Sequence, residues 1–226
     1  MTGWLRAWGL TTVVVLVVVA GGVGVWAGYF SQWFALRSIV VTGNTTVTKE
    51  EVVRRLALTP GEPLMRVDLD ESTARVEGIR VVASARVGRE FPHTLRVELV
   101  ERTPVAYVDG PDGAHLVDKT GVDFSTIPTP PEGSAKLVVA RPSPKDPATA
   151  AALAVLSQLP DELRAQVAQV DAKSEIEVSV TLGDGRVVVF GSSKDVPRKA
   201  QVALALLTQP AQTYNVSSPN TPVLAN

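Results

Sequence analysis

The sequence has no cysteine and only two histidines among its 226 residues, which excludes several classes of chemistry. Without thiols there can be no disulfide framework, thiolate zinc site, iron–sulfur cluster or cysteine nucleophile. His93 and His115 are too few for a multi-histidine metal site. An excess of basic charge is also missing, because 22 Lys and Arg are balanced by 23 Asp and Glu, for a net charge of -1. Binding to nucleic acid through the phosphate backbone is therefore not expected.

Charged residues are absent from one long stretch near the N-terminus, between Arg6 and Arg37. As a helix, the 19 residues from Leu10 to Gly28 would span about 28 Å, close to the ~30 Å hydrocarbon core of a bilayer. Aromatic residues flank this run at both ends, as in interfacial belts: Trp4, Trp8, Trp26, Tyr29 and Trp33. We predict a transmembrane helix at residues 9–30, preceded by a short cytoplasmic tail at residues 1–8.

The orientation of this helix follows from Arg6, the one basic side chain on the short side. The positive-inside rule keeps the N-terminus cytoplasmic and places the bulk of the chain outside, as in a single-pass type II protein. A cleaved signal peptide is the alternative, with 20–22 (Ala-Gly-Gly) as the cleavage site. The uncharged run exceeds the usual signal-peptide core and ends in a second aromatic cluster, which favours an uncleaved anchor.

The next segment reads as strand, helix, helix, strand, strand. An apolar run at 36–42 ends at a Gly-Asn turn, and capping boxes at Thr48 and Asp68 begin two helices that end near Ala57 and Gly78. Two strands are expected at 79–87 and 94–100, and the second alternates apolar with charged residues. This order predicts a two-layer domain with both helices on one side of a three-stranded sheet.

These residues resemble a known family. The membrane segment, the run 34–44 (FALRSIVVTGN), the helix start at 48–52 (TKEEV) and the run 85–107 are together similar to the POTRA domain of the bacterial division protein family FtsQ/DivIB, in an actinobacterial-like form. The Phe91-Pro92 turn and the exit at Glu101, Arg102 and Pro104 are the most specific matches. The resemblance implies a POTRA domain (β-α-α-β-β) at residues 34–103.

The remainder reads mostly as strands with flanking helices. Hairpins are expected at 105–117 and at 175–190, where Asp-Gly turns join the strands, and a further strand at 137–140. Helices are expected at 148–159 and 197–207, before a last extended stretch at 213–217. This matches the β domain of the same family, so we predict an α+β chain with a mainly antiparallel β domain at residues 104–218 and a C-terminal tail at 219–226.

The sequence contains only weak candidates for a catalytic site. His115 near Asp112, Asp118 and Ser125 could suggest a serine hydrolase, but no nucleophile elbow is present. The pairs Asp109 with Asp112 and Asp161 with Glu162 could cleave a glycosidic bond in a cell wall, yet Asp-Gly turns and a helix N-cap explain them more simply. We expect no catalytic, cofactor-binding or metal-binding residue, no cofactor and no small-molecule substrate. A membrane-anchored, extracytoplasmic cell-wall hydrolase is the alternative function.

The C-terminal stretch from Ala200 to Asn226 carries no charged side chain. A last strand often forms a sheet edge, and exposed edges usually carry lysines, prolines or bulges that prevent another chain from pairing with them. An open edge would accept a partner strand through main-chain hydrogen bonds. The resemblance implies that this strand and the preceding helix dock the division protein FtsB, itself paired with FtsL. The predicted partner-binding residues are Lys199, Thr213, Tyr214, Asn215, Val216 and Ser217.

Together these features predict a non-enzymatic, single-pass scaffold of the divisome, in the cell membrane and enriched at the division septum. Its β domain would dock FtsB and FtsL, and its POTRA domain and membrane helix would meet other divisome membrane proteins. An outer-membrane transporter with POTRA domains is excluded because about 120 residues after Thr103 hold too few alternating strands for a barrel.

Overall fold

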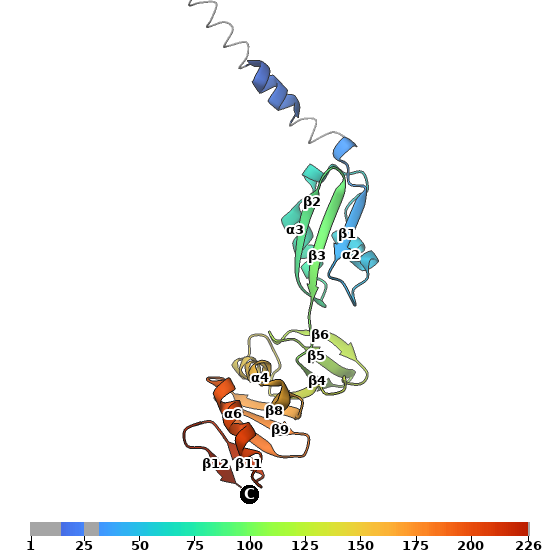
Figure 1. The fold of residues 1–226 in the computed structure, drawn as a ribbon. Helices are drawn as coiled ribbons and strands as arrows, with labels where there is room; N and C mark the ends of the chain where they lie inside the picture. The colour runs from blue at the N-terminus through green and yellow to red at the C-terminus, as the bar shows by residue number, and fades with distance from the viewer. Residues whose placement is uncertain (1–14, 25–31, 226) are drawn as a thin grey trace, which may run out of the picture. The chain divides into compact units, whose positions relative to one another are not determined.

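The computed structural model describes residues 15–24 and 32–225, which are drawn in colour in Figure 1. The chain divides into two compact units, Met1–Glu101 and Arg102–Asn226. Residues 15–24 are helical, but no helix within the described residues is long and apolar enough to cross a membrane. The predicted cytoplasmic tail at 1–8 lies outside the described residues, as does most of the predicted membrane helix at 9–30.

The first unit has the predicted order of one strand, two helices and two strands. Its elements are η1 (Gln32–Phe34), β1 (Ser38–Thr42), α2 (Lys49–Leu56), η2 (Leu64–Arg66), α3 (Leu69–Glu77), β2 (Val82–Glu90) and β3 (Thr94–Glu101). The strands lie in the order β1-β3-β2, with β1 parallel and β2 antiparallel to the central β3.

Both predicted helix caps of this unit are confirmed. The Thr48 hydroxyl accepts a hydrogen bond from the Glu51 amide at 3.2 Å, and the Asp68 carboxylate accepts one from the Glu71 amide at 2.9 Å. The capped helices bury Val52, Leu56 and Val76 against the sheet. Because the buried side chains of both helices and of the sheet form one cluster, the unit has its own hydrophobic core.

The turn after β1 is held by a glycine and by a carboxylate from the far end of β3. Gly43 has φ of 82°, and a Cβ there would lie 2.0 Å from the Leu99 carbonyl oxygen, so no larger residue fits. The Glu101 carboxylate accepts hydrogen bonds from the amides of Thr45, Thr46 and Val47 at 2.7 to 2.9 Å. Burial alone would raise the pKa of Glu101, but these amides outweigh it and lower the pKa.

The second unit is built on one nine-stranded sheet. Its elements are β4 (Ala106–Gly110), β5 (Gly113–Val117), β6 (Asp123–Ile127), β7 (Ala135–Val139), α4 (Pro147–Gln158), α5 (Asp161–Arg164), β8 (Val167–Ser174), β9 (Glu177–Leu182), β10 (Val187–Gly191), α6 (Val196–Leu206), β11 (Thr213–Asn215) and β12 (Val223–Ala225). The strand order is β12-β11-β10-β9-β8-β7-β4-β5-β6.

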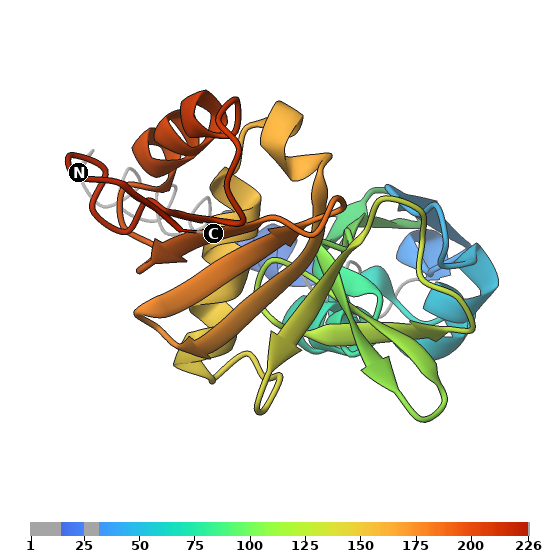
Figure 2. The ribbon, with the colours of Figure 1, turned by 90° about the horizontal axis from the view of Figure 1, so that it is seen from below.

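Five of the eight strand pairs in this sheet are antiparallel, as the sequence predicted, but the sheet is mixed. Three strand pairs are parallel: β4 with β7, β7 with β8, and β10 with β11. Helices α4 and α6 make the crossover connections that two of these pairs need. Figure 2 shows the yellow helix α4 lying against the orange strands β8 and β9. The large core of this unit lies between these helices and the sheet.

Candidate functional site

The predicted open edge at 213–217 is wrong, because a further strand lies outside it. β11 pairs in parallel with β10 on one side and antiparallel with β12 on the other. Strand β12 comes from the segment that the sequence analysis assigned to a C-terminal tail. Among the described residues, the outermost strand at this end of the sheet is therefore β12.

Two side chains of the predicted strand lie in the core and not on a surface. Tyr214 and Val216 have no exposed area, and both belong to the core of the second unit. The Tyr214 hydroxyl donates to the Gln209 carbonyl at 2.6 Å, and the Arg186 guanidinium lies 5.8 Å from the centre of the tyrosine ring. These contacts fix the loop between α6 and β11.

Lys199, the other predicted binding residue, is also buried. Its ammonium group donates to the carbonyls of Phe190 and Ser192 at 2.9 and 2.8 Å, and 4% of the residue is exposed. Burial lowers the pKa of Lys199, against the attraction of Asp195, which raises it. The lysine joins α6 to the end of β10, a structural role that its position on the helix does not reveal.

Partial exposure remains at the alternate positions of the same strand. Thr213 and Asn215 are half-buried and Ser217 is exposed. The Asn215 side-chain oxygen accepts from the amide and the hydroxyl of Ser217 at 3.0 and 2.7 Å, which shapes the turn toward β12. Arg198 of α6 donates to the side-chain oxygen of Asn220 in that turn at 2.7 Å.

The edge strand β12 is uncharged and exposed. Its three residues are exposed, and Val223 and Leu224 are large apolar side chains. The Ala225 carbonyl accepts from the Gln212 amide at 3.1 Å, so the backbone of Ala225 faces β11. Successive residues of a strand direct their N–H and C=O groups to opposite edges. The N–H and C=O of Leu224 therefore face outward.

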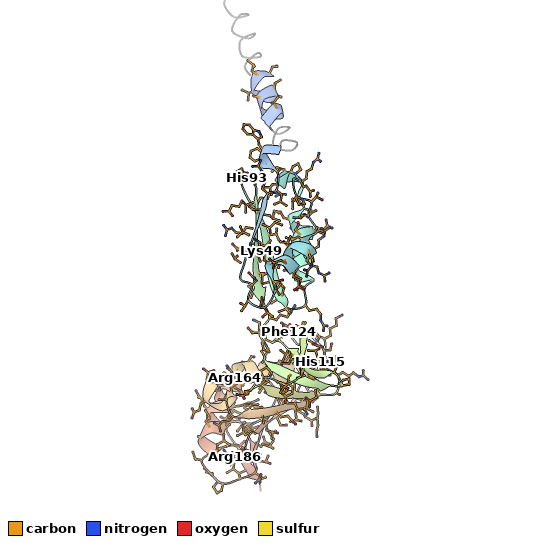
Figure 3. The ribbon with its side chains drawn as sticks, turned by 90° about the vertical axis from the view of Figure 1, so that its right-hand side faces the viewer. Lys49, His93, His115, Phe124, Arg164 and Arg186 are labelled. Atoms are coloured by element: carbon orange, nitrogen blue, oxygen red, sulfur yellow. The ribbon has the colours of Figure 1, made fainter. Side chains whose placement is uncertain are left out.

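Several of the residues considered for catalysis have structural partners. His115 lies between two carboxylates, with Nε2 2.7 Å from Asp112 and Nδ1 2.9 Å from Asp123, and these neighbours in that order raise the pKa of His115. Figure 3 labels His115 on β5 and Phe124 on the adjacent β6. Asp109 pairs with Lys136 at 2.6 Å.

Asp118 is not part of the histidine cluster, contrary to the arrangement considered from sequence. It is 4% exposed, forms an ion pair with Arg102, and accepts hydrogen bonds from the amides of Thr120 and Val122. Burial would raise the pKa of Asp118, but the bonds from Thr120, Arg102 and Val122 outweigh it and lower the pKa. Within the described residues, no group of three or more acidic, histidine or cysteine residues could hold a metal ion.

Comparison with known proteins gives two family matches that together extend over most of the chain. Residues 34–102 match the family model "POTRA domain, FtsQ-type", and residues 106–218 match "Cell division protein FtsQ/DivIB, C-terminal". Strand β12 lies beyond the second matched range.

Similar proteins are known from several actinobacteria. The cell division protein FtsQ of Mycobacteroides abscessus is 46% identical over 215 residues, which are 95% of this chain and 69% of that protein. The FtsQ of Mycobacterium tuberculosis is 45% identical over 95% of this chain and 68% of its own length, and that of Streptomyces bingchenggensis is 34% identical over 96% and 85%. The chain therefore belongs to the FtsQ/DivIB family of bacterial cell division proteins.

Proposed function

We propose that this protein is a non-enzymatic, single-pass membrane scaffold of the divisome that docks FtsB, paired with FtsL, on the outer edge of β12. Membership of a cell-division family supports the role in the divisome. The uncharged, exposed edge strand at the end of the nine-stranded sheet is the observation that carries the docking mode.

The main chain of β12 supplies the attraction in this mode. Among the described residues β12 pairs with β11 alone, so the N–H and C=O of Leu224 are left to bind a partner strand. A partner strand that pairs here would extend the sheet by one strand. Val223 and Leu224 would add apolar contact. No side chain from Ala200 onward is charged, so none would repel a partner strand or have to lose its hydration when that strand pairs.

The residues first predicted to bind act mainly by holding this edge in place. Lys199, Tyr214 and Val216 are buried, and they position α6 and β11, the strand that pairs with β12. Thr213, Asn215 and Ser217 keep some exposed surface one strand inward from the edge. Contacts of these three side chains with a partner stay a prediction.

The membrane part of the proposal rests on the sequence. The uncharged run between Arg6 and Arg37 is long enough for one crossing, and Arg6 favours a cytoplasmic N-terminus. The bulk of the chain would then lie outside the cytoplasmic membrane at the septum, with the POTRA unit next to the bilayer. Reporter fusions at each end test this orientation, since an exported N-terminus contradicts it.

The docking mode is tested by a matched pair of variants at one position. Leu224→Ala removes the side chain and keeps the outward N–H, whereas Leu224→Pro removes the N–H as well. A lost hydrogen bond costs about 0.5–1.5 kcal/mol, so we expect the proline variant to bind the purified FtsB–FtsL complex severalfold more weakly than the alanine variant. The assay is a titration of the full chain in detergent, with circular dichroism to check that both variants fold.

Two outcomes would contradict docking on the edge of β12. Equal affinities of the two variants would mean that main-chain pairing at Leu224 contributes nothing. Tighter binding after truncation before Val223 would mean that a partner strand replaces β12 instead of pairing with it.

A further inference from the structure

Three bulky apolar side chains are exposed at one end of the first unit, each from a different segment. Trp33 in η1 is 81% exposed, Phe91 in the turn between β2 and β3 is 54% exposed, and Met65 in η2 is 40% exposed. We call these three residues the apolar tip. Figure 3 marks the same end of the unit by His93, which follows Phe91 in that turn.

Two contacts join the η1 segment to the turn between β2 and β3. The rings of Phe34 and Phe91 meet edge to face with centroids 5.8 Å apart. The backbone amide of Arg37 donates to the His93 carbonyl at 3.0 Å. Trp33 and Phe91 are therefore carried by segments that are packed together.

The η2 segment is fixed to the same end by backbone and arginine bonds. Ala35 and Pro63 form an antiparallel bridge, which joins the start of η2 to the end of η1. The Arg89 guanidinium of β2 donates to the carbonyls of Leu64 and Val67 at 2.7 and 2.6 Å, on either side of Met65. The apolar tip is thus a preformed surface, and its exposure needs an explanation other than a loose loop.

We propose that the apolar tip docks on the outer surface of the membrane, with Trp33, Met65 and Phe91 in the interfacial layer of the bilayer. This inference rests on the proposed membrane anchor at residues 9–30. The ligand is a lipid surface, and the consequence is that the POTRA unit is held against the bilayer instead of swinging freely on its anchor.

The length of chain between anchor and tip favours lipid as the occupant. Trp33 is three residues beyond Phe30, where the predicted membrane helix ends, and three residues reach at most about 11 Å. The interfacial layer on each side of the hydrocarbon core is itself about 5–8 Å thick. Tryptophan is enriched at this depth because its ring is apolar and its N–H is polar. Met65 and Phe91 share the same end of the unit and so face the same layer.

The charge of the surrounding surface agrees with a lipid ligand. Arg37 and Arg66 are exposed cations on the segments that carry the tip. Of the carboxylates on these segments, Glu62 is half-buried and Glu90 is paired with Arg96 at 2.8 Å. Exposed arginines beside apolar side chains suit a bilayer with anionic headgroups.

The absence of cysteine makes a site-specific test clean. The full chain with Met65→Cys carries one environment-sensitive fluorophore and is reconstituted in vesicles of phosphatidylcholine and phosphatidylglycerol that contain a headgroup-depth nitroxide lipid. The matched control is Val100→Cys, an apolar position with 60% exposure on the same unit. Val100 lies six residues along β3 from Thr94, which is about 20 Å from the end of the strand that adjoins the tip.

We expect strong quenching of the label at position 65 and little at position 100. Adding Phe91→Ser to the Met65→Cys chain removes about half of a buried phenylalanine's transfer free energy, so the docked-to-undocked ratio should fall roughly fivefold to tenfold. Equal quenching at the two positions overturns the inference. Protection of position 65 only after a partner protein is added also overturns it, since the tip is then a protein-binding surface.

Flotation of the same vesicles at alkaline pH separates this inference from the proposed anchor. A chain that does not float with the vesicles is not integrated, and the proposed membrane scaffold fails. A chain that floats but shows equal quenching at positions 65 and 100 keeps its anchor and lacks tip docking. Circular dichroism of the Phe91→Ser variant checks that loss of the Phe34 contact has not unfolded the unit.

Discussion

Replacing Glu101 by glutamine should unfold the POTRA unit at a lower temperature, because one carboxylate holds the turn after β1. The amides of Thr45, Thr46 and Val47 all donate to it. A hydrogen bond to a charged group contributes about 1.5–3 kcal/mol, and one between neutral groups about 0.5–1.5 kcal/mol. Glutamine keeps one acceptor oxygen, and two of the three amides are exposed enough to bind water. The net loss should be about 1–3 kcal/mol, or roughly 5–20 °C in Tm for a domain of this size.

The difference in stability between wild type and Glu101→Gln should disappear in acid. The pKa of Glu101 is lowered in the folded chain, so its stabilisation is fully present above the unfolded value near 4.5. That stabilisation disappears as the pH falls through the lowered folded pKa. Wild type and Glu101→Gln should therefore converge at low pH.

Thermal unfolding of the full chain in detergent, followed by circular dichroism, measures the difference. Hydrogen exchange at Thr45, Thr46 and Val47 reports on the turn itself, and these amides should lose protection in the variant. The matched control is Glu98→Gln on the same strand, which removes an equal charge from an exposed position. If Glu101→Gln and Glu98→Gln melt together, or if the Glu101→Gln deficit persists in acid, the reasoning is refuted.

Three further substitutions test the second unit, each by urea denaturation. Val216→Lys should cost about 3 kcal/mol or more because it buries an ammonium group in the core, and wild-type stability would contradict that packing. Lys199→Met should cost about 1–3 kcal/mol, since two buried carbonyls lose their donor while the desolvation of a charge is relieved. Asp118→Asn should cost about 2–4 kcal/mol by leaving Arg102 without its carboxylate. That cost should vanish in acid, because the pKa of Asp118 is lowered and its stabilisation is lost as the pH falls through the folded value.

The POTRA unit could be predicted from sequence because its signals are local. The caps at Thr48 and Asp68 form through side chains three residues from the amides they accept from. Apolar and polar residues alternate along β3, which predicts a strand with one buried face, and the burial of these residues alternates in the same way. None of these features needs knowledge of a distant neighbour.

The strands missed in the second unit depend on their neighbours in space. β8 lies in the middle of the sheet, but register shifts between Val167 and Gln169 and between Ala172 and Ser174 break the period of two that marks a strand. Without β8 the helix at 147–158 could not be recognised as a parallel crossover. A register shift also interrupts the pairing of β6 with β5, so β6 lacks a regular pattern. Helix α5 is a single turn of four residues, too short to show helical periodicity.

The sheet edge predicted at residues 213–217 lies one strand inward from the edge in the structure. Pro219 and Pro222 indicated the end of regular structure, yet the chain turns between them and adds β12 to the sheet. The burial of Lys199 depends on carbonyls at the end of β10 and leaves no signature in the helix that carries it.

The uncharged stretch after Lys199 has two physical causes, and only one of them concerns a partner. Ala200 and Ala203 are buried on α6, and Tyr214 and Val216 are buried around β11, so the core excludes charge there. Burial does not exclude charge at Val223 and Leu224, because both side chains are exposed on an edge where a lysine would be tolerated. Because an uncharged apolar edge is an aggregation hazard for an unbound chain, its presence supports the proposed partner strand. Residues 223–225, and not the whole uncharged stretch, therefore support partner binding.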